Sequence, residues 1–383
     1  MLTKKNHIPF NSPLFFKNSL VDINNLKYKK HYSSDGYFSK KCSEWLVKNI
    51  KCKQALLVNS CTTALEMSAI LMDIKKNDEI IMPSYTFVST ANAFVMRGGK
   101  PVFVDIEKTT LTICLKSIER AITKKTKAIV VVHYSGISPD MDKLVNLCKK
   151  NKIFLVEDAA QAIYSFYKNR MLGSFGDFAC LSFHETKNIH CGQGGALLIN
   201  NSKFIERAKI IKDKGTNRSQ FEKNLVKKYT WVDIGSSYGL SEINCAYLYC
   251  QMLKIKKIIN KRIKIWNAYF KYFSKIKNMQ NPQIPKYNKH NGHIYYVIIK
   301  NFFLRDKILK ALNKKKVNAV FHYVPLHSSK AGKKYARISG NLSNTVLISK
   351  SLIRLPLFYD FKISDVKKFF NIFNKCLIKN SYK

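Results

Sequence analysis

The stretch that decides the fold is IFLVEDAAQAIYSFYKNRMLGSFGDFACLSFHETKNIHCGQGGALLI, residues 153–199. It contains three short apolar runs, at 153–156, 179–183 and 196–199. Each run is continuously apolar instead of alternating with polar residues, which is typical of strands buried on both faces of a largely parallel sheet. The stretch therefore predicts strands of an α/β domain.

The same pattern extends toward the N-terminus. Four more apolar runs precede the stretch, at 55–58, 79–82, 101–104 and 128–132. Amphipathic segments predict helices at 62–72, 87–97, 115–122, 140–150 and 203–213. Because strands that alternate with helices build a sheet covered on both faces, we expect a three-layer α/β/α domain with a mostly parallel sheet.

The C-terminal part of the chain has a different pattern. A long helical pattern covers 240–275 and can connect two domains. Beyond it, the sequence predicts strands at 294–299 and 319–323 and helices at 306–313 and 365–374. We therefore predict a large domain over residues 1–250 and a smaller C-terminal α+β domain over residues 251–383.

The chain is strongly basic. Its 383 residues include 67 Lys and Arg against 24 Asp and Glu, a formal net charge of +43. Only nine of the basic residues are Arg, which is favoured for bidentate recognition of phosphate and guanine, and Lys is spread along the whole chain. We therefore expect a solvated lysine-rich surface and no specific nucleic acid partner. A polyanion-binding protein without catalytic activity stays the alternative from another class.

Cysteine usage and hydropathy indicate the compartment. None of the ten Cys residues forms a C-x-x-C pair or has metal-ligand spacing, so we expect no metal site and a reducing environment. No stretch approaches the ~18 apolar residues that span a bilayer, and no apolar segment follows the basic N-terminus. These features predict a cytoplasmic protein without a membrane partner.

Reactive polar residues follow several predicted strands. His133 and Asp158 come at the ends of two apolar runs, and Lys187 follows a third. Ligands of open α/β sheets bind outside the carboxyl ends of the strands, so we expect these side chains to converge. The turn NSCTTA, residues 59–64, precedes a predicted helix whose free N–H groups suit a phosphate, although Ser60 and Thr62 also make ordinary N-caps.

The acid, the amine and the turn together fit pyridoxal 5′-phosphate (PLP). This cofactor needs a lysine for its Schiff base and a carboxylate that keeps its pyridine nitrogen protonated. Lys187 and Asp158 supply both groups, and the turn can hold the phosphate. Considered alone, Lys187 is explained as a surface lysine and Asp158 as part of a solvated acidic loop, so neither residue by itself indicates the cofactor.

Several motifs resemble one family of PLP enzymes. They are PSYTFVSTANAF (83–94), VFVDIEKTTLTI (102–113), EDAAQ (157–161), GSFGDFACLSFHETKN (173–188) and GQGGALLIN (192–200). They resemble the DegT/DnrJ/StrS-type sugar-nucleotide aminotransferases, and the resemblance extends from IPFNSP (8–13) to RLPLFYD (354–360). It implies PLP-dependent transferase fold type I and a homodimer with shared active sites.

A closer resemblance indicates a substrate. It rests on NSCTTALEM (59–67), DKGTNRSQF (213–221), KYTWVDIGSSY (228–238) and VFHYVPLH (320–327). These motifs are similar to those of family members that transfer the amino group of L-glutamate to the C4 ketone of dTDP-4-dehydro-6-deoxyglucose. That product feeds surface polysaccharides such as enterobacterial common antigen. Because the same scaffold aminates C3 or C4 of several nucleotide sugars, another keto sugar stays open as the substrate.

The resemblance also implies roles for individual residues. It places the Schiff base and the catalytic base on Lys187, the partner of the pyridine nitrogen on Asp158 and a contact to the phenolic oxygen on Gln161. Phe87 would stack on the ring, which agrees with the preference of a planar ring for an aromatic neighbour. The implied phosphate contacts are Ser182, Cys61, Thr62 and Thr63.

Two departures from the family pattern and a set of substrate candidates complete the prediction. Ser237 stands where many relatives have an Asn that reaches the phosphate from the neighbouring subunit, and Gln193 replaces a usual Glu. A sugar nucleotide presents hydroxyl groups and a diphosphate, and the candidates to bind it are His133, His184, Arg218, His322 and His327. For each His, a structural role stays equally open.

Overall fold

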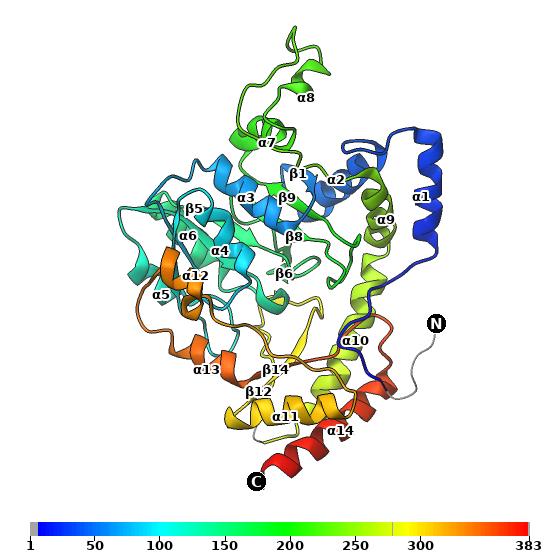
Figure 1. The fold of residues 1–383 in the computed structure, drawn as a ribbon, viewed down its shortest axis with the longest axis vertical. Helices are drawn as coiled ribbons and strands as arrows, with labels where there is room; N and C mark the ends of the chain where they lie inside the picture. Colours follow the sequence, from blue (N-terminus) through cyan, green and yellow to red (C-terminus); the bar gives the residue numbers. More distant parts are fainter. Residues whose placement is uncertain (1–6, 278, 382–383) are drawn as a thin grey trace.

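An eight-stranded sheet forms the centre of the molecule (Figure 1). The computed structural model describes residues 7–277 and 279–381. The strand order is β1-β9-β8-β5-β4-β2-β3-β13; neighbours from β8 to β13 are parallel, whereas β9 is antiparallel to β1 and β8. The strands are β1 Gln54–Val58, β2 Glu79–Pro83, β3 Lys100–Val104, β4 Thr126–Val132, β5 Phe154–Asp158, β8 Phe178–Ser182, β9 Gly195–Ile199 and β13 Arg337–Ile338. All seven apolar runs predicted in this part of the sequence are strands of the sheet, which confirms the mostly parallel α/β architecture.

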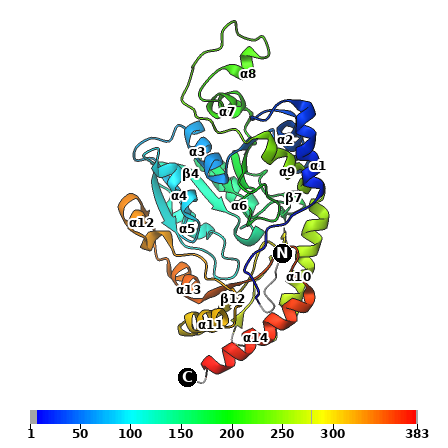
Figure 2. The same cartoon turned by 45° about the vertical axis from the view of Figure 1, so that its right-hand side comes forward.

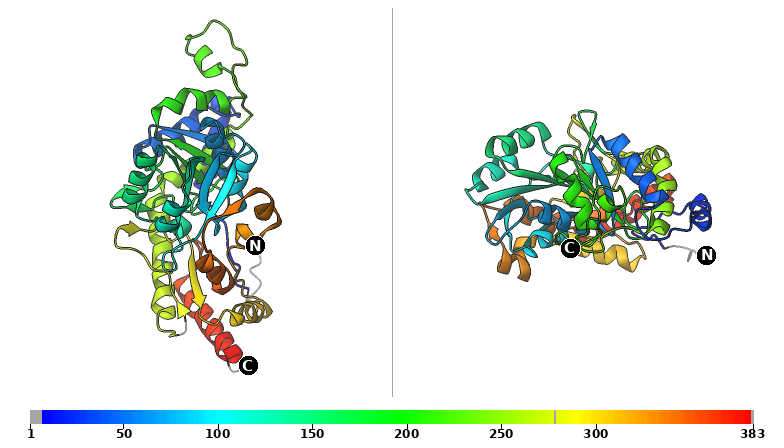
Figure 3. Two further views of the ribbon diagram at one scale, coloured as in Figure 1. Left: turned by 90° about the vertical axis from the view of Figure 1, so that its left-hand side faces the viewer. Right: turned by 90° about the horizontal axis from the view of Figure 1, so that it is seen from above.

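Helices cover both faces of this sheet (Figure 3). Side chains of β4 alternate between the two faces, so that Val131 joins the apolar core beneath α2, α5, α6 and α9, and Val130 joins the core beneath α3, α4 and α7. The helices are α2 Tyr37–Ile50, α3 Cys61–Leu71, α4 Val88–Val95, α5 Leu115–Ala121, α6 Met141–Asn151, α7 Ile205–Lys212 and α9 Glu242–Leu253. Three layers result, as predicted.

A second, smaller sheet follows the long helix α10, Ile255–Phe273, in the chain and packs against it (Figure 2). Its order is β10-β12-β14, and helices α11 and α14 pack on it. Aromatic side chains fill much of the core between them, among them Trp266, Tyr269, Phe273, Tyr295 and Phe369. The bounds are β10 Met279–Gln280, β12 Tyr295–Ile299, β14 Leu352–Leu355, α11 Phe303–Lys314 and α14 Ile363–Ser381.

The C-terminal part differs from the prediction in three ways. The helical pattern over 240–275 forms two helices, since Lys254 leaves the helical conformation with φ −103° and ψ 11° between α9 and α10. The predicted strand at 319–323 is wrong: Val320 forms one bridge with Arg354, and the chain then turns so that the next residues reach a cavity. Strand β13 lies in the predicted small domain but pairs with β3 of the large sheet. A domain boundary at residue 250 would also fall inside α9. The domain limits therefore stay a prediction.

The sequence analysis did not predict several elements. They are the helices α1 Asn18–Lys29, α2, α8 Arg218–Phe221, α12 Lys330–Tyr335 and α13 Ser343–Ser351, and the strands β6 Phe166–Tyr167, β7 Arg170–Met171, β10, β11 Asn288–Lys289, β13 and β14. None of the helices within the described residues is long and apolar enough to cross a membrane.

Candidate active site

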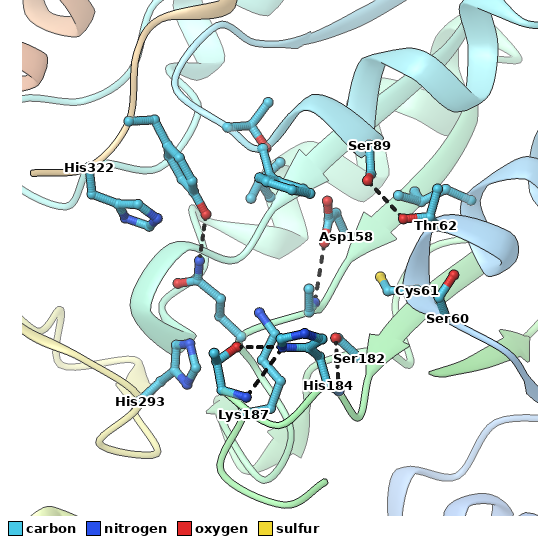
Figure 4. Close-up of a pocket in the computed structure, with 18 of the residues that line it drawn as sticks. Ser60, Cys61, Thr62, Ser89, Asp158, Ser182, His184, Lys187, His293 and His322 are labelled. Carbon is cyan, nitrogen blue, oxygen red and sulfur yellow. Dashed lines mark hydrogen bonds between the residues drawn. The ribbon is translucent and has the colours of Figure 1, made fainter. Parts of the chain in front are cut away.

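A cavity of about 760 Å³ opens at the carboxyl ends of three adjacent parallel strands (Figure 4). Val132, Asp158 and Ser182, the last residues of β4, β5 and β8, all line it. Nine of the predicted site residues line this cavity: Cys61, Thr62, Phe87, Asp158, Gln161, Ser182, His184, Lys187 and His322. The fold therefore brings together groups that are more than 250 residues apart in the sequence, from Cys61 to His322.

Asp158 is held in place by hydrogen bonds. Its carboxylate accepts a hydrogen bond of 2.7 Å from the hydroxyl of Thr90 and one of 3.2 Å from the backbone N–H of Ala160. Thr90 is fully buried in α4, and its hydroxyl also pairs with that of Thr86 at 2.8 Å. The carboxylate is thus fixed from two sides while it faces the cavity.

Lys187 lies on the turn that follows β8, with its amine inside the cavity (Figure 4). Burial lowers the pKa of Lys187, and the nearby charge of Asp158 partly opposes that shift. The same two charges act on Cys61: burial raises the pKa of its thiol, Asp158 raises it further and Lys187 lowers it. The amine and the carboxylate therefore share one electrostatic environment.

The N-terminus of α3 forms one wall of the cavity. Ser60 is its N-cap and accepts a hydrogen bond of 3.0 Å from the backbone N–H of Thr63, while the hydroxyls of Thr62 and Ser89 pair at 2.7 Å. Gly195 of β9 lies directly behind this turn, because a Cβ there would be 2.3 Å from the carbonyl carbon of Ser60. A helix start with free N–H groups and hydroxyls is a site for a phosphate.

Gln161 and Phe87 approach the cavity from two other elements. The side-chain oxygen of Gln161 accepts a hydrogen bond of 2.7 Å from the N–H of Ser135, and its amide donates one of 3.0 Å to the hydroxyl of Tyr323. Phe87 directly precedes α4 and leaves 56% of its surface exposed, although it is apolar. An exposed aromatic face at a cavity is suited to cover a planar ring.

His133 does not reach the cavity, contrary to the prediction that it contacts substrate. Successive residues of a strand point to opposite faces of the sheet. Val132 and Asp158 line the cavity, so the side chains of His133 and Glu157 point to the other face. His133 is fully buried and pairs with Glu157 at 2.8 Å. Burial alone would raise the pKa of Glu157. The hydrogen bonds with His133 and with backbone N–H groups of 173–176 outweigh burial and keep this pKa below its usual value. The pair therefore stabilises the fold behind the site.

Four further predicted residues lie outside the cavity lining. His327 hydrogen bonds to Ser84 at 2.7 Å. Arg218 is half-exposed and pairs with Glu222 at 2.8 Å. The remaining two are Thr63, whose backbone N–H donates to the N-cap Ser60, and Ser237, whose carbonyl accepts a bond of 3.0 Å from Asn59. Within the described part of this single chain, these side chains do not join the nine.

The cavity also contains residues that the sequence analysis missed. Tyr323, His293 and Arg354 line it from the smaller sheet side, and Thr90 lies directly behind Asp158. The sequence did contain a signal for Thr90. Hydroxyl side chains cluster in PSYTFVST, residues 83–90, where a strand ends and a helix begins. No local pattern marks Arg354 among nine Arg residues.

Comparison with known proteins identifies the family. Residues 17–374 match the DegT/DnrJ/EryC1/StrS aminotransferase family. The chain belongs to this family. An uncharacterized protein of Methanocaldococcus jannaschii is 31% identical over 337 residues, which cover 86% of this chain and 87% of that protein. The family resemblance in the sequence motifs is thus confirmed.

Two solved aminotransferase structures are similar over almost the whole chain. The aminotransferase TlmJ from Streptoalloteichus hindustanus is 25% identical with a TM-score of 0.90, covering 98% of this chain and 100% of TlmJ. PseC of Helicobacter pylori, an aminotransferase involved in the biosynthesis of pseudoaminic acid, is 26% identical with a TM-score of 0.89, covering 97% of this chain and 99% of PseC. Both support the PLP-dependent transferase fold.

The family depends on PLP, and the cavity fits this cofactor. Lys187, whose amine pKa is lowered by burial, would react with the aldehyde, the fixed carboxylate of Asp158 would face the pyridine nitrogen, and the N-terminus of α3 would hold the phosphate. Among the residues that the structure describes, no cluster of His, Cys, Asp and Glu could hold a metal ion.

Proposed function

We propose that the protein transfers the amino group of L-glutamate to the C4 ketone of dTDP-4-dehydro-6-deoxyglucose. The product would be dTDP-4-amino-4,6-dideoxygalactose, a precursor of surface polysaccharide of the enterobacterial common antigen type. The proposal is carried by Lys187 and Asp158, which line one cavity beside the start of α3. A sugar substrate is supported by the motif VFHYVPLH, whose His322 and Tyr323 line the same cavity, and by the similarity to PseC.

The chemistry divides between the cofactor and the chain. When bound, PLP supplies an aldehyde that captures amines and a ring that accepts electrons. Lys187 is the base that takes the proton from the substrate carbon bearing the amino group, because burial favours its neutral form. Asp158, held by Thr90, would be the carboxylate that pairs with the pyridine nitrogen of bound PLP. Donor and acceptor use one cavity in turn, so we expect ping-pong kinetics.

The experiment is incubation of the purified protein with L-glutamate and dTDP-4-dehydro-6-deoxyglucose, followed by NMR of the sugar product. We expect an amino group at C4 with galacto configuration. Amination at C3, or only of another keto nucleotide sugar, would show the family alternative. A protein without bound PLP that instead binds DNA with salt-resistant affinity would refute the enzyme in favour of the polyanion-binding alternative.

We also propose that the protein works as a homodimer with shared active sites. The segment 213–238, which contains α8, extends away from the body of the molecule (Figure 1). It exposes large apolar side chains at Leu225 (69%) and Trp231 (76%), which a partner subunit would cover. Ser237 and Arg218 of this segment would then serve the site of the other subunit. A dilution-independent monomer with full activity would exclude this arrangement.

The cytoplasm stays the proposed compartment. All ten Cys residues are free, and eight of them are buried. Unpaired cysteines are typical of proteins in a reducing environment.

A further inference from the structure

His293 lines the cavity but has no role in the proposed chemistry so far. It lies on the loop just before β12 and is only 5% exposed. Figure 4 shows it on the side of Lys187 that is opposite to Cys61 and the start of α3. His293 therefore borders the part of the cavity that lies beyond the reacting amine, away from the place that suits a phosphate.

Hydrogen bonds hold the loop of His293 from two directions. Arg262 of α10 donates 2.7 Å from Nη2 to the carbonyl of His293 and 3.1 Å from Nε to the carbonyl of Gly292. The fully buried side chain of Asn291 accepts a bond of 3.0 Å from the backbone N–H of His293 and donates one of 2.9 Å to the carbonyl of Gln161. The backbone position of His293 is thus set both by α10 and by the turn that follows β5.

Asn188, the residue after Lys187, fixes the ring of His293. Nδ2 of Asn188 donates a bond of 3.0 Å to the carbonyl of Asn291, so its Oδ1 must accept the bond of 2.9 Å from Nδ1 of His293. The imidazole proton therefore lies on Nδ1. Burial, followed by the charge of Lys187 and of other nearby cations, lowers the pKa of His293 well below its usual value, which keeps the ring neutral.

Nε2 of His293 is consequently a neutral acceptor at the wall of the cavity. Within residues 7–277 and 279–381 it has no hydrogen bond partner. The imidazole of His322 differs, because its Nε2 lies 3.2 Å from Nη1 of Arg354 and its Nδ1 lies 3.0 Å from the hydroxyl of Tyr134. The cavity therefore offers the lone pair of His293 to a ligand.

This lone pair distinguishes the two substrates of the proposed reaction. A carboxylate can only accept hydrogen bonds, so the carboxylates of an amino-acid donor are repelled by a second acceptor. A hydroxyl can donate to it. The keto sugar carries a hydroxyl at C3, on the carbon next to its C4 ketone, and L-glutamate has no hydroxyl.

We infer that Nε2 of His293 accepts a hydrogen bond from the sugar hydroxyl next to the reacting carbon. This inference rests on the proposed function, because it assumes a keto sugar as the amino acceptor, and it makes His293 a specificity-determining residue for that sugar. The hydroxyl and the reacting carbon are neighbours in one ring, so the bond fixes which carbon of the sugar faces Lys187. The amino-acid donor is bound without His293.

The test uses the full-length, PLP-loaded protein and the variant His293→Asn. Asparagine can keep an N–H donor to Asn188 at the place of Nδ1, and it removes Nε2. His290→Asn is the matched control, since His290 belongs to the same loop and lies outside the cavity lining.

Calorimetry compares three ligands that carry no ketone and do not react. They are dTDP, which has no hexose, dTDP-6-deoxygalactose, and the analogue of this sugar nucleotide that lacks the C3 hydroxyl. The half-reaction with L-glutamate and the half-reaction with the amino-sugar product are followed in parallel by the absorbance of the cofactor.

We expect His293→Asn to weaken binding of dTDP-6-deoxygalactose about 5- to 100-fold, as the loss of a buried hydrogen bond partner does, and to raise the KM of the amino-sugar half-reaction similarly. The wild type should bind the 3-deoxy analogue as weakly as the variant does, because either change removes the same bond. Binding of dTDP, the glutamate half-reaction and the control variant should change little.

Three outcomes would overturn the inference. One is a wild type that binds the 3-deoxy analogue as tightly as the parent sugar nucleotide. Another is an equal loss in both half-reactions, which would make His293 a support for the turn of Lys187 through Asn188. The third is an equal loss of affinity for dTDP and for its sugar. Failure of the proposed function is distinguishable, because the wild type would then bind none of the three thymidine ligands.

Discussion

The hydrogen bond between Thr90 and Asp158 gives the sharpest test of the site. Thr90→Val keeps the shape of the side chain and removes the hydroxyl that donates to the buried carboxylate at 2.7 Å. A lost hydrogen bond to a charged group costs about 1.5–3 kcal/mol, and 1.4 kcal/mol is a factor of ten. We therefore expect a loss of unfolding free energy in that range. We also expect an about tenfold or greater fall in kcat/KM, since the carboxylate is no longer fixed opposite the pyridine nitrogen.

A matched control separates the site from general stability. Thr345 is also fully buried, and its hydroxyl donates to Asp105 at 2.8 Å, outside the cavity lining. Thr345→Val should lower the unfolding free energy by a similar amount, measured by urea denaturation, and leave kcat/KM and PLP retention unchanged. If both variants reduced kcat/KM equally, or if Thr90→Val left it unchanged, the role given to Thr90 would be refuted.

Three further predictions concern Lys187 and Glu157. Lys187→Ala should lose the absorbance band of the cofactor bonded to lysine and show no turnover; a variant that still completes turnovers would contradict its role. The rate at which apoenzyme takes up PLP should rise with pH as the Lys187 amine becomes neutral, with a midpoint below the ordinary lysine value of 10.5. Asp158→Asn should move this midpoint lower, because the Asp158 charge raises the pKa of Lys187, and an upward shift measured by stopped-flow absorbance would disprove the coupling. Glu157→Gln removes the buried carboxylate that hydrogen bonds to His133 and to backbone N–H groups of 173–176, and should cost about 1.5–3 kcal/mol of unfolding free energy, the cost of a lost hydrogen bond to a charged group. Since the folded pKa of Glu157 is lowered, its stabilisation is present above the unfolded pKa and is lost as the pH falls through the folded value, so the acid limb of a stability profile should flatten in this variant.

Much of the large sheet could be predicted because its signals are local. A continuously apolar run marks a buried strand whatever surrounds it, so β5 and β8 and the polar residues at their ends were evident from the sequence. The segment 319–323 is apolar in a similar way, yet only Val320 pairs with β14, because His322 and Tyr323 leave the strand and line the cavity instead. Pairing is a property of the whole sheet and leaves no local mark.

The sequence by itself determined that a carboxylate and an amine follow two predicted strands and that a turn with hydroxyl groups precedes a predicted helix. Only the tertiary structure decided that Thr90 fixes Asp158, that His133 turns away from the cavity to pair with Glu157, and that Arg354 arrives from the smaller sheet. The physical reason is that strand position is set by side chains close in the chain, whereas the direction and partners of a side chain depend on register and packing between distant segments.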